Sequence, residues 1–124
     1  MIVGKEKSSD GGERRKKLRR IRLVDDDTRM LLVSYIQDVI LKRYKKEEKF
    51  SSNTLFTKIP DDLINTPLRV LYEIIKNKYP DDERAVKSNT MKYLGMLVRE
   101  AVYCSEVEFY ESIESDIRTF KRMN

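Results

Sequence analysis

The chain contains no histidine and only one cysteine, Cys104. Histidine is the commonest general base and metal ligand, so pairs of a serine or cysteine nucleophile with histidine are excluded. A single cysteine allows neither an internal disulfide bond nor a zinc site of the usual four-ligand kind, which fits a reducing compartment. Gly95 is the only glycine in the predicted helical body, so we find no glycine-rich phosphate loop. We therefore expect a non-catalytic protein without a metal or cofactor.

Long apolar runs are absent as well. No segment approaches the ~18 apolar residues of a membrane span, and the polar N-terminus lacks the apolar core of a signal peptide. Hydrophobic residues make up 40% of the 124 residues, which is enough for one modest core, and charged residues make up 38%. These values predict an intracellular protein of one-domain size with no membrane partner.

Positive charge is concentrated in the first 24 residues. This segment holds nine lysines and arginines against three acids, whereas the rest of the chain is close to neutral. Glycine, serine and charged residues dominate residues 1–17, so we predict a disordered, flexible basic arm over residues 1–24. Three roles are open for this arm: contact with nucleic-acid phosphates, a nuclear import signal, or a solubilising tail. Its densest part, the basic cluster, consists of Arg14, Arg15, Lys16, Lys17, Arg19 and Arg20.

Apolar periodicity predicts helices in most of the remaining chain. The first covers residues 28–46, and the second covers residues 67–78, where Tyr79 and Pro80 end it. The third runs from about residue 83 to residue 103, and a last amphipathic segment has its apolar residues at positions 109, 113, 117 and 120. Residues 20–24 alternate polar and apolar side chains and permit a short strand. Because no strands alternate with the helices, the predicted fold class is all-α.

Acidic residues gather in three groups near the starts of the predicted helices. The groups are Asp25 to Asp27, Asp61 with Asp62, and Asp81 with Asp82. Such groups suggest a metal site or general acid–base catalysis, but carboxylates at a helix start also accept the unpaired backbone N–H groups of the first turn. We interpret all three groups as helix caps.

The third predicted helix has almost no polar face. Its apolar side chains form two offset stripes, which indicates a helix contacted from more than one side. A chain of this length has few other elements that could cover the helix. We therefore expect a second subunit to cover it. Gly95 costs about 1 kcal/mol relative to alanine inside a helix, and a close helix crossing would explain its presence. The residues expected to form the core and the partner interface are Tyr93, Leu94, Leu97, Val98, Ala101 and Val102.

The same helix resembles part of a known family. Tyr93-Leu94 followed by Val98-Arg99-Glu100-Ala101-Val102 is similar to the long central helix of the centromere protein X family of histone-fold proteins. The segment from Ile113 to Ile117 resembles the start of that family's third helix. The resemblance covers roughly residues 66–124. It implies a histone-fold-like order of helix, long helix and short helix, with an extra helix on the N-terminal side.

Charge and periodicity, together with the resemblance, predict a division of the chain, and the resemblance implies a set of partners. Residues 1–24 would be the arm, residues 25–58 a helix with its connector, and residues 59–124 the histone-fold-like domain. The expected partners are a second histone-fold subunit similar to centromere protein S, in a heterodimer, and double-stranded DNA bound through its phosphates without sequence preference. The expected location is the nucleus, in a kinetochore or DNA-repair complex. We expect phosphate contacts from the basic cluster and, secondarily, from Arg84 and Lys87.

Two other classes of function remain open. The first is a small dimeric transcription regulator of prokaryotic or viral origin. It would be either a ribbon-helix-helix protein with residues 20–24 as its strand, or a helix-turn-helix protein whose recognition helix opens at Ser88-Asn89-Thr90. The polar stretch of residues 45–57 argues against the former, and the apolar residues after Leu94 argue against the latter. The second class is an adaptor that binds only proteins.

Overall fold

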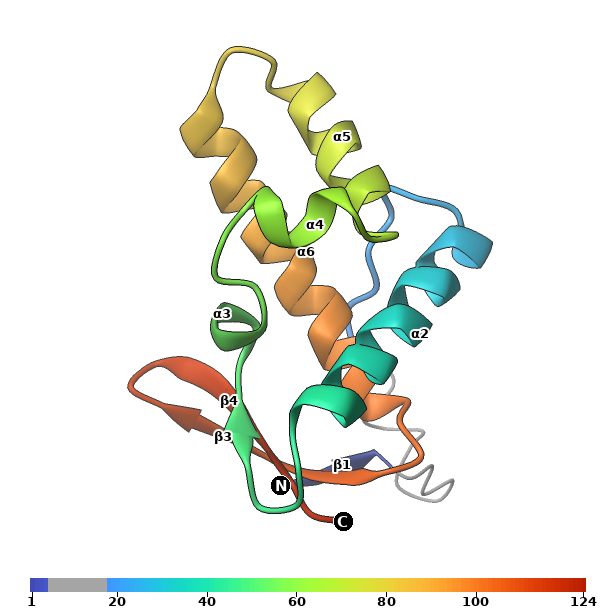
Figure 1. The fold of residues 1–124 in the computed structure, drawn as a ribbon, viewed down its shortest axis with the longest axis vertical. Coiled ribbons are helices and arrows are strands. Elements are labelled where there is room, and N and C mark those ends of the chain that lie inside the picture. Colours follow the sequence, from blue (N-terminus) through green and yellow to red (C-terminus); the bar gives the residue numbers. More distant parts are fainter. Residues whose placement is uncertain (5–17) are drawn as a thin grey trace.

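The long helix α6 runs through the centre of the protein. The computed structural model describes residues 1–4 and 18–124, and α6 spans Glu83–Tyr103 (Figure 1). Asp82 caps this helix, because its side chain accepts a hydrogen bond from the Ala85 backbone N–H at 3.0 Å. Helices α2, α3 and α5 pack against α6, and strand β1 contacts it from the side of the sheet. The elements around α6 therefore come from almost the whole length of the chain.

Within the described residues, the other helices are α2 (Asp26–Arg43), α3 (Ser52–Leu55), α4 (Asp61–Ile64) and α5 (Arg69–Lys78). Asp25 caps α2 by accepting a hydrogen bond from the Thr28 backbone N–H at 2.7 Å. The side chain of Asp62, in contrast, accepts from the N–H groups of Thr57 and Lys58 in the preceding loop. The three long predicted helices are thus confirmed with small shifts at their ends, and the cap hypothesis holds for Asp25 and Asp82.

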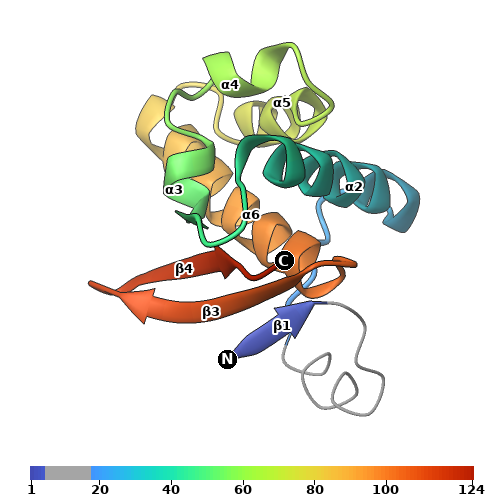
Figure 2. The same ribbon diagram turned by 60° about the horizontal axis from the view of Figure 1, so that its bottom comes forward.

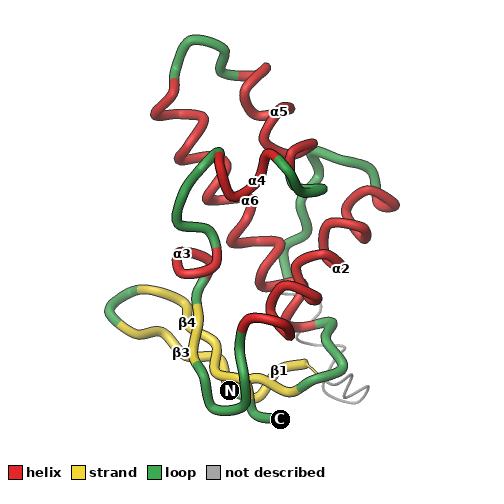
Figure 3. Tube along the Cα trace, in the orientation of Figure 1, coloured by secondary structure: helices red, strands yellow, loops and turns green. Residues whose placement is uncertain are grey.

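An antiparallel sheet forms the second layer of the fold (Figure 2). Its strands are β1 (Ile2–Gly4), β2 (Lys49–Phe50), β3 (Glu108–Glu114) and β4 (Ile117–Arg122), in the order β1-β3-β4-β2. The described helices all lie on one face of this sheet (Figure 3). Strands β3 and β4 form a hairpin in which Glu114 pairs with Ile117. The two turn residues, Ser115 and Asp116, have φ angles of 53° and 65°, as a type I′ turn requires.

The sheet shows that the all-α prediction was wrong. The segment expected to be the third helix of a histone fold, around Ile113 to Ile117, is the tip of the β3–β4 hairpin. The apolar positions 109, 113, 117 and 120 fit a helical spacing, but a buried acid, Glu111, concealed the alternation typical of a strand. Phe109 and Glu111 face inward in β3, and Phe120 faces inward beside them in β4.

The core is one continuous cluster that joins both layers. Phe50 stands at its base, stacked on Tyr44 at a centroid distance of 4.7 Å and in contact with Phe109 and Phe120 at 5.8 and 5.6 Å. Gly4, with φ of 86°, lies so close to the Val107 carbonyl that no Cβ fits there. Strand β1 can therefore approach the end of α6, and its residue Val3 is buried in the core between them.

The residues expected at a partner interface are buried by the chain itself. Leu94, Leu97, Ala101 and Val102 are 0% exposed and Val98 is 1% exposed, while Tyr93 is half-buried. Their cover comes from α2, α5, α3 and the sheet. The physical reason given for a second subunit, a helix too apolar for its own chain to cover, therefore does not hold.

The described parts of the predicted basic arm pack against the body of the protein. Residues 2–4 form β1, and Leu18 and Ile21 are 8% and 4% exposed. Residues 20–24 form no strand, which corrects the prediction made from their alternation and removes the strand that a ribbon-helix-helix protein needs. Residues 5–17, with Arg14, Arg15, Lys16 and Lys17 of the basic cluster, lie outside the described residues.

Candidate nucleic-acid interface

One side of α6 carries mainly polar residues from Arg84 to Arg99. Arg84, Ser88, Lys92, Gly95 and Arg99 follow one another at intervals of three or four residues, which places them on the same side of a helix. We call this set the polar stripe. Its first three residues are exposed, while Gly95 and Arg99 are partly buried where the helix passes the sheet. The stripe lies opposite the face that carries Leu94, Leu97 and Ala101 of the core.

The second half of the polar stripe faces a cleft of about 250 Å³. The cleft lies between α6, strand β4 and residues 18–24, with the start of α3 at one side. Four of its described lining residues are cationic and none is acidic. We call it the basic cleft, and the residues that line it are Arg19, Ser52, Lys92, Gly95, Met96, Val98, Arg99, Arg118 and Phe120.

A buried carboxylate beside the cleft holds two of these cations in place. Glu111 is 6% exposed, and its Oε2 accepts a hydrogen bond from Arg118 Nη1 at 2.5 Å. Its Oε1 accepts from the Tyr103 hydroxyl at 2.5 Å, and Arg99 Nη2 donates to that hydroxyl at 3.2 Å. The Arg99 guanidinium also lies over the Tyr103 ring, 5.0 Å from its centroid. These contacts fix the orientation of the Arg99 and Arg118 guanidinium groups at the cleft.

The charge balance in this network leaves the cleft positive. Burial, and then the hydrogen bond to Glu111, raise the pKa of Tyr103 above its ordinary value of 10.0, so its hydroxyl remains a neutral donor at physiological pH. Glu111 supplies one negative charge against Arg99 and Arg118, while Arg19 and Lys92 add two further cations. Ordered guanidiniums with excess positive charge bind phosphate oxygens well, because they can donate two parallel hydrogen bonds.

A second ion pair, between Arg29 and Glu100, is buried and also attracts Arg20 of the segment 18–24. Arg29 of α2, 7% exposed in its side chain, donates from Nη1 to Oε2 of Glu100 at 3.2 Å. Arg20 Nε lies 3.8 Å from the same oxygen, and its side chain is 53% exposed. Burial raises the pKa of Glu100 above its ordinary value of 4.5, and the two arginines oppose that rise. Arg20 therefore lies near Glu100 rather than in the cleft, whereas its neighbour Arg19 lines the cleft.

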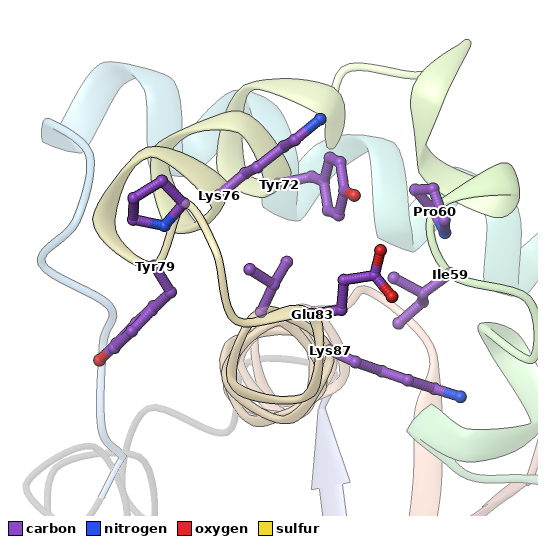
Figure 4. A pocket seen from close by; sticks show the side chains of 9 residues that line it. Ile59, Pro60, Tyr72, Lys76, Tyr79, Glu83 and Lys87 are labelled. Atoms are coloured by element: carbon purple, nitrogen blue, oxygen red, sulfur yellow. The ribbon is translucent and has the colours of Figure 1, made fainter.

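A larger pocket of about 400 Å³ opens on another side of α6 (Figure 4). It lies between the Ile59–Pro60 loop, α5 and the first turns of α6, and Tyr72 and Val86 supply part of its apolar wall. In Figure 4 the Lys76 side chain points away from the pocket, whereas the Glu83 carboxylate points toward the space between Tyr72 and Ile59. An acid aimed into the pocket repels phosphate, so this pocket suits an anionic polymer less well than the basic cleft.

The structure brings together some of the predicted DNA-contact residues and separates others. Arg19 lines the basic cleft, and Arg84 lies at the exposed start of the polar stripe. Lys87 is exposed but lines the other pocket. Lys92, Arg99 and Arg118 were not predicted. Lys92 and Arg99 could have been found in the sequence from their spacing relative to Arg84. Placing Arg118 near them requires the knowledge that β3 and β4 form a hairpin.

Comparison with known proteins gives no relative: no family model, curated protein or solved structure matches the chain. Among residues 1–4 and 18–124, no three potential ligands of the His, Cys, Asp or Glu type gather closely enough to hold a metal ion. In the same residues no helix is both long and apolar enough to cross a membrane.

Proposed function

We propose that this protein is a non-catalytic, DNA-binding protein that contacts duplex DNA through the polar stripe of α6 and the basic cleft beside it. The observation that supports this most directly is the convergence of Arg19, Lys92, Arg99 and Arg118 on one cleft from separate parts of the chain. Clustered cations that face the same way are the electrostatic signature of a surface that binds nucleic-acid phosphates.

The order of the elements supports the same proposal. Helix α5, a four-residue connection and helix α6 form a helix-turn-helix, and the β3–β4 hairpin follows α6 directly. Helix α2 and strand β2 come before them, and β2 pairs with β4 of the hairpin. The short helices α3 and α4 lie between β2 and α5. In helix-turn-helix proteins that bind DNA, the second helix of the motif lies in the major groove, and α6 is the second helix of this motif.

In this proposal the exposed half of α6 enters the major groove. The major groove, about 12 Å wide, admits one α-helix. Arg84 and Lys92 are exposed on the side of α6 that would face the duplex, where they contact the phosphates along the edges of the groove. The hairpin then lies beside α6 with Arg118 toward the DNA backbone, and Arg19 contacts the backbone from the other segment that lines the cleft. These cations make the binding strongly dependent on salt concentration.

The proposal is tested by measuring binding of a fluorescent DNA duplex at about 50 and about 200 mM salt. We expect Lys92→Ala and Arg84→Ala each to weaken binding by about tenfold at low salt and to reduce the salt slope by about 0.9, because each removes one phosphate contact. Both side chains are exposed on α6, so the fold should be unaffected.

Lys76→Ala provides the matched control, because this exposed lysine lies on α5 and lines the other pocket. It removes the same charge from the chain and should leave the affinity nearly unchanged. Equal losses from Lys76→Ala and Lys92→Ala would show a general charge effect rather than a binding surface. If the wild-type chain shows no salt-dependent binding to the duplex, the proposed function is wrong.

A further inference from the structure

Gly95, in the middle of the long helix α6, forms part of the wall of the basic cleft. A Cβ added to Gly95 would meet Ser52 Oγ at 3.7 Å, which is an ordinary van der Waals contact. Alanine would therefore fit, and it would stabilise the helix by about 1 kcal/mol. The close helix crossing expected at Gly95 is not the reason for this residue. What glycine changes at this position is the shape of the cleft.

We propose that one backbone phosphate of bound DNA enters the basic cleft and contacts the α6 main chain at Gly95. This inference depends on the proposed function, because the exposed part of the polar stripe brings the duplex to the cleft. Arg19, Lys92 and Arg118 come from three different segments and line the same cleft as Gly95. The hydroxyl of Ser52, near the point where a Cβ would lie, can donate a further hydrogen bond to a phosphate oxygen.

The size and ordering of the cleft fit this ligand. A volume of about 250 Å³ equals that of about eight water molecules at ~30 Å³ each, which leaves room for a phosphate and part of the adjoining sugars. Glu111 already holds Arg118, and Tyr103 holds Arg99, so little side-chain entropy is lost when a phosphate binds. A methyl group at position 95 would extend from the wall of the cleft toward Ser52 and keep the phosphate away from these donors.

The decisive variant is Gly95→Ala, which separates folding from binding. We expect its melting temperature to rise by a few degrees, because alanine favours the helix. We expect its affinity for duplex DNA to fall by about tenfold, with a salt slope smaller by about 0.9, because one phosphate loses its charge-assisted hydrogen bonds. Asn77→Ala, at an exposed position of α5, is the control: it also gains helix propensity and should keep the wild-type affinity.

A Gly95→Ala variant that is stabilised and binds DNA like the wild type would overturn the inference. The proposed function would survive that result if Lys92→Ala and Arg84→Ala still weaken binding. A wild-type chain that binds no duplex would instead refute the proposed function before any variant is compared.

A second measurement avoids reliance on the stability of the variant. The chain has four glycines, so a protein labelled with ¹⁵N-glycine gives few amide signals. During titration with duplex DNA, the Gly95 signal should move, whereas the signal of Gly4, which pairs with Glu108 in the sheet, should stay in place. Saturating DNA that leaves the Gly95 signal unmoved would contradict a phosphate at this position.

Discussion

The buried residue Glu100 makes the stability of this protein depend on pH. Its side chain is 2% exposed, its Oε1 has no hydrogen-bond partner among the described residues, and burial raises its pKa above 4.5 despite Arg29 and Arg20. An acid whose pKa is raised by folding binds its proton more tightly in the folded state than in the unfolded state. Its contribution to stability is therefore fully present below pH 4.5 and is lost as the pH rises through the raised pKa.

The raised pKa of Glu100 predicts that stability falls as the pH rises. Between about pH 4 and about pH 8, the free energy of unfolding of the wild type should fall relative to that of Glu100→Gln, because glutamine cannot ionise. Urea denaturation at several pH values measures the difference. The control is Glu106→Gln, at an exposed position after α6, which should follow the wild type closely. A difference between wild type and Glu100→Gln that does not change with pH would contradict the raised pKa.

The hairpin β3–β4 is the element with the clearest local requirement. Both turn residues have positive φ angles. This conformation costs an L-amino acid about 1–2 kcal/mol, less for aspartate and asparagine, whereas glycine adopts it freely. Asp116→Gly should therefore raise the free energy of unfolding by about 0.5–1 kcal/mol, as measured by thermal or urea denaturation. Thr119→Gly, inside β4, is the opposing control and should lower stability. A destabilised Asp116→Gly variant would show that the turn contributes something other than its backbone conformation.

The elements differ in how well the sequence predicted them. The helices α2, α5 and α6 were predictable, because apolar periodicity agrees with start signals such as Asp25 and Asp82 and with the stop at Tyr79-Pro80. The hairpin was not, because its apolar residues also fit a helical spacing. A short edge strand such as β1 carries too few residues for any periodicity to be seen, and it forms only because β3 offers a partner.

At the scale of the whole molecule, α6 is enclosed by segments of its own chain. We expect the protein, produced without any partner, to unfold in one cooperative transition in a denaturation experiment. Leu94→Ala should lower the free energy of unfolding by about 3 kcal/mol, because Leu94 is fully buried. Leu31→Ala, at a position that is 68% exposed, is the control and should change little. A chain that gains tertiary structure only after a second protein is added would contradict this expectation.

The candidate interface was only partly accessible from the sequence. Arg19 and Arg84 were predicted from charge and position, and the spacing of Lys92 and Arg99 was visible but was outweighed by the apolar residues around them. Arg118 and Glu111 could not be placed, because their relation to α6 depends on a hairpin that was predicted to be a helix. Long-range pairing of strands decides this surface, and a periodicity measured within one segment does not report it.

Helix α6 supplies both the core and the polar stripe, so most of its positions belong to one of these two surfaces. A library that varies each position in turn should yield two periodic tolerance profiles, one for cellular abundance and one for retention on DNA. Each would repeat about every 3.6 residues, and the two would be out of phase. Selecting such a library once for abundance and once for retention on DNA would show which positions of α6 serve the core and which serve the polar stripe.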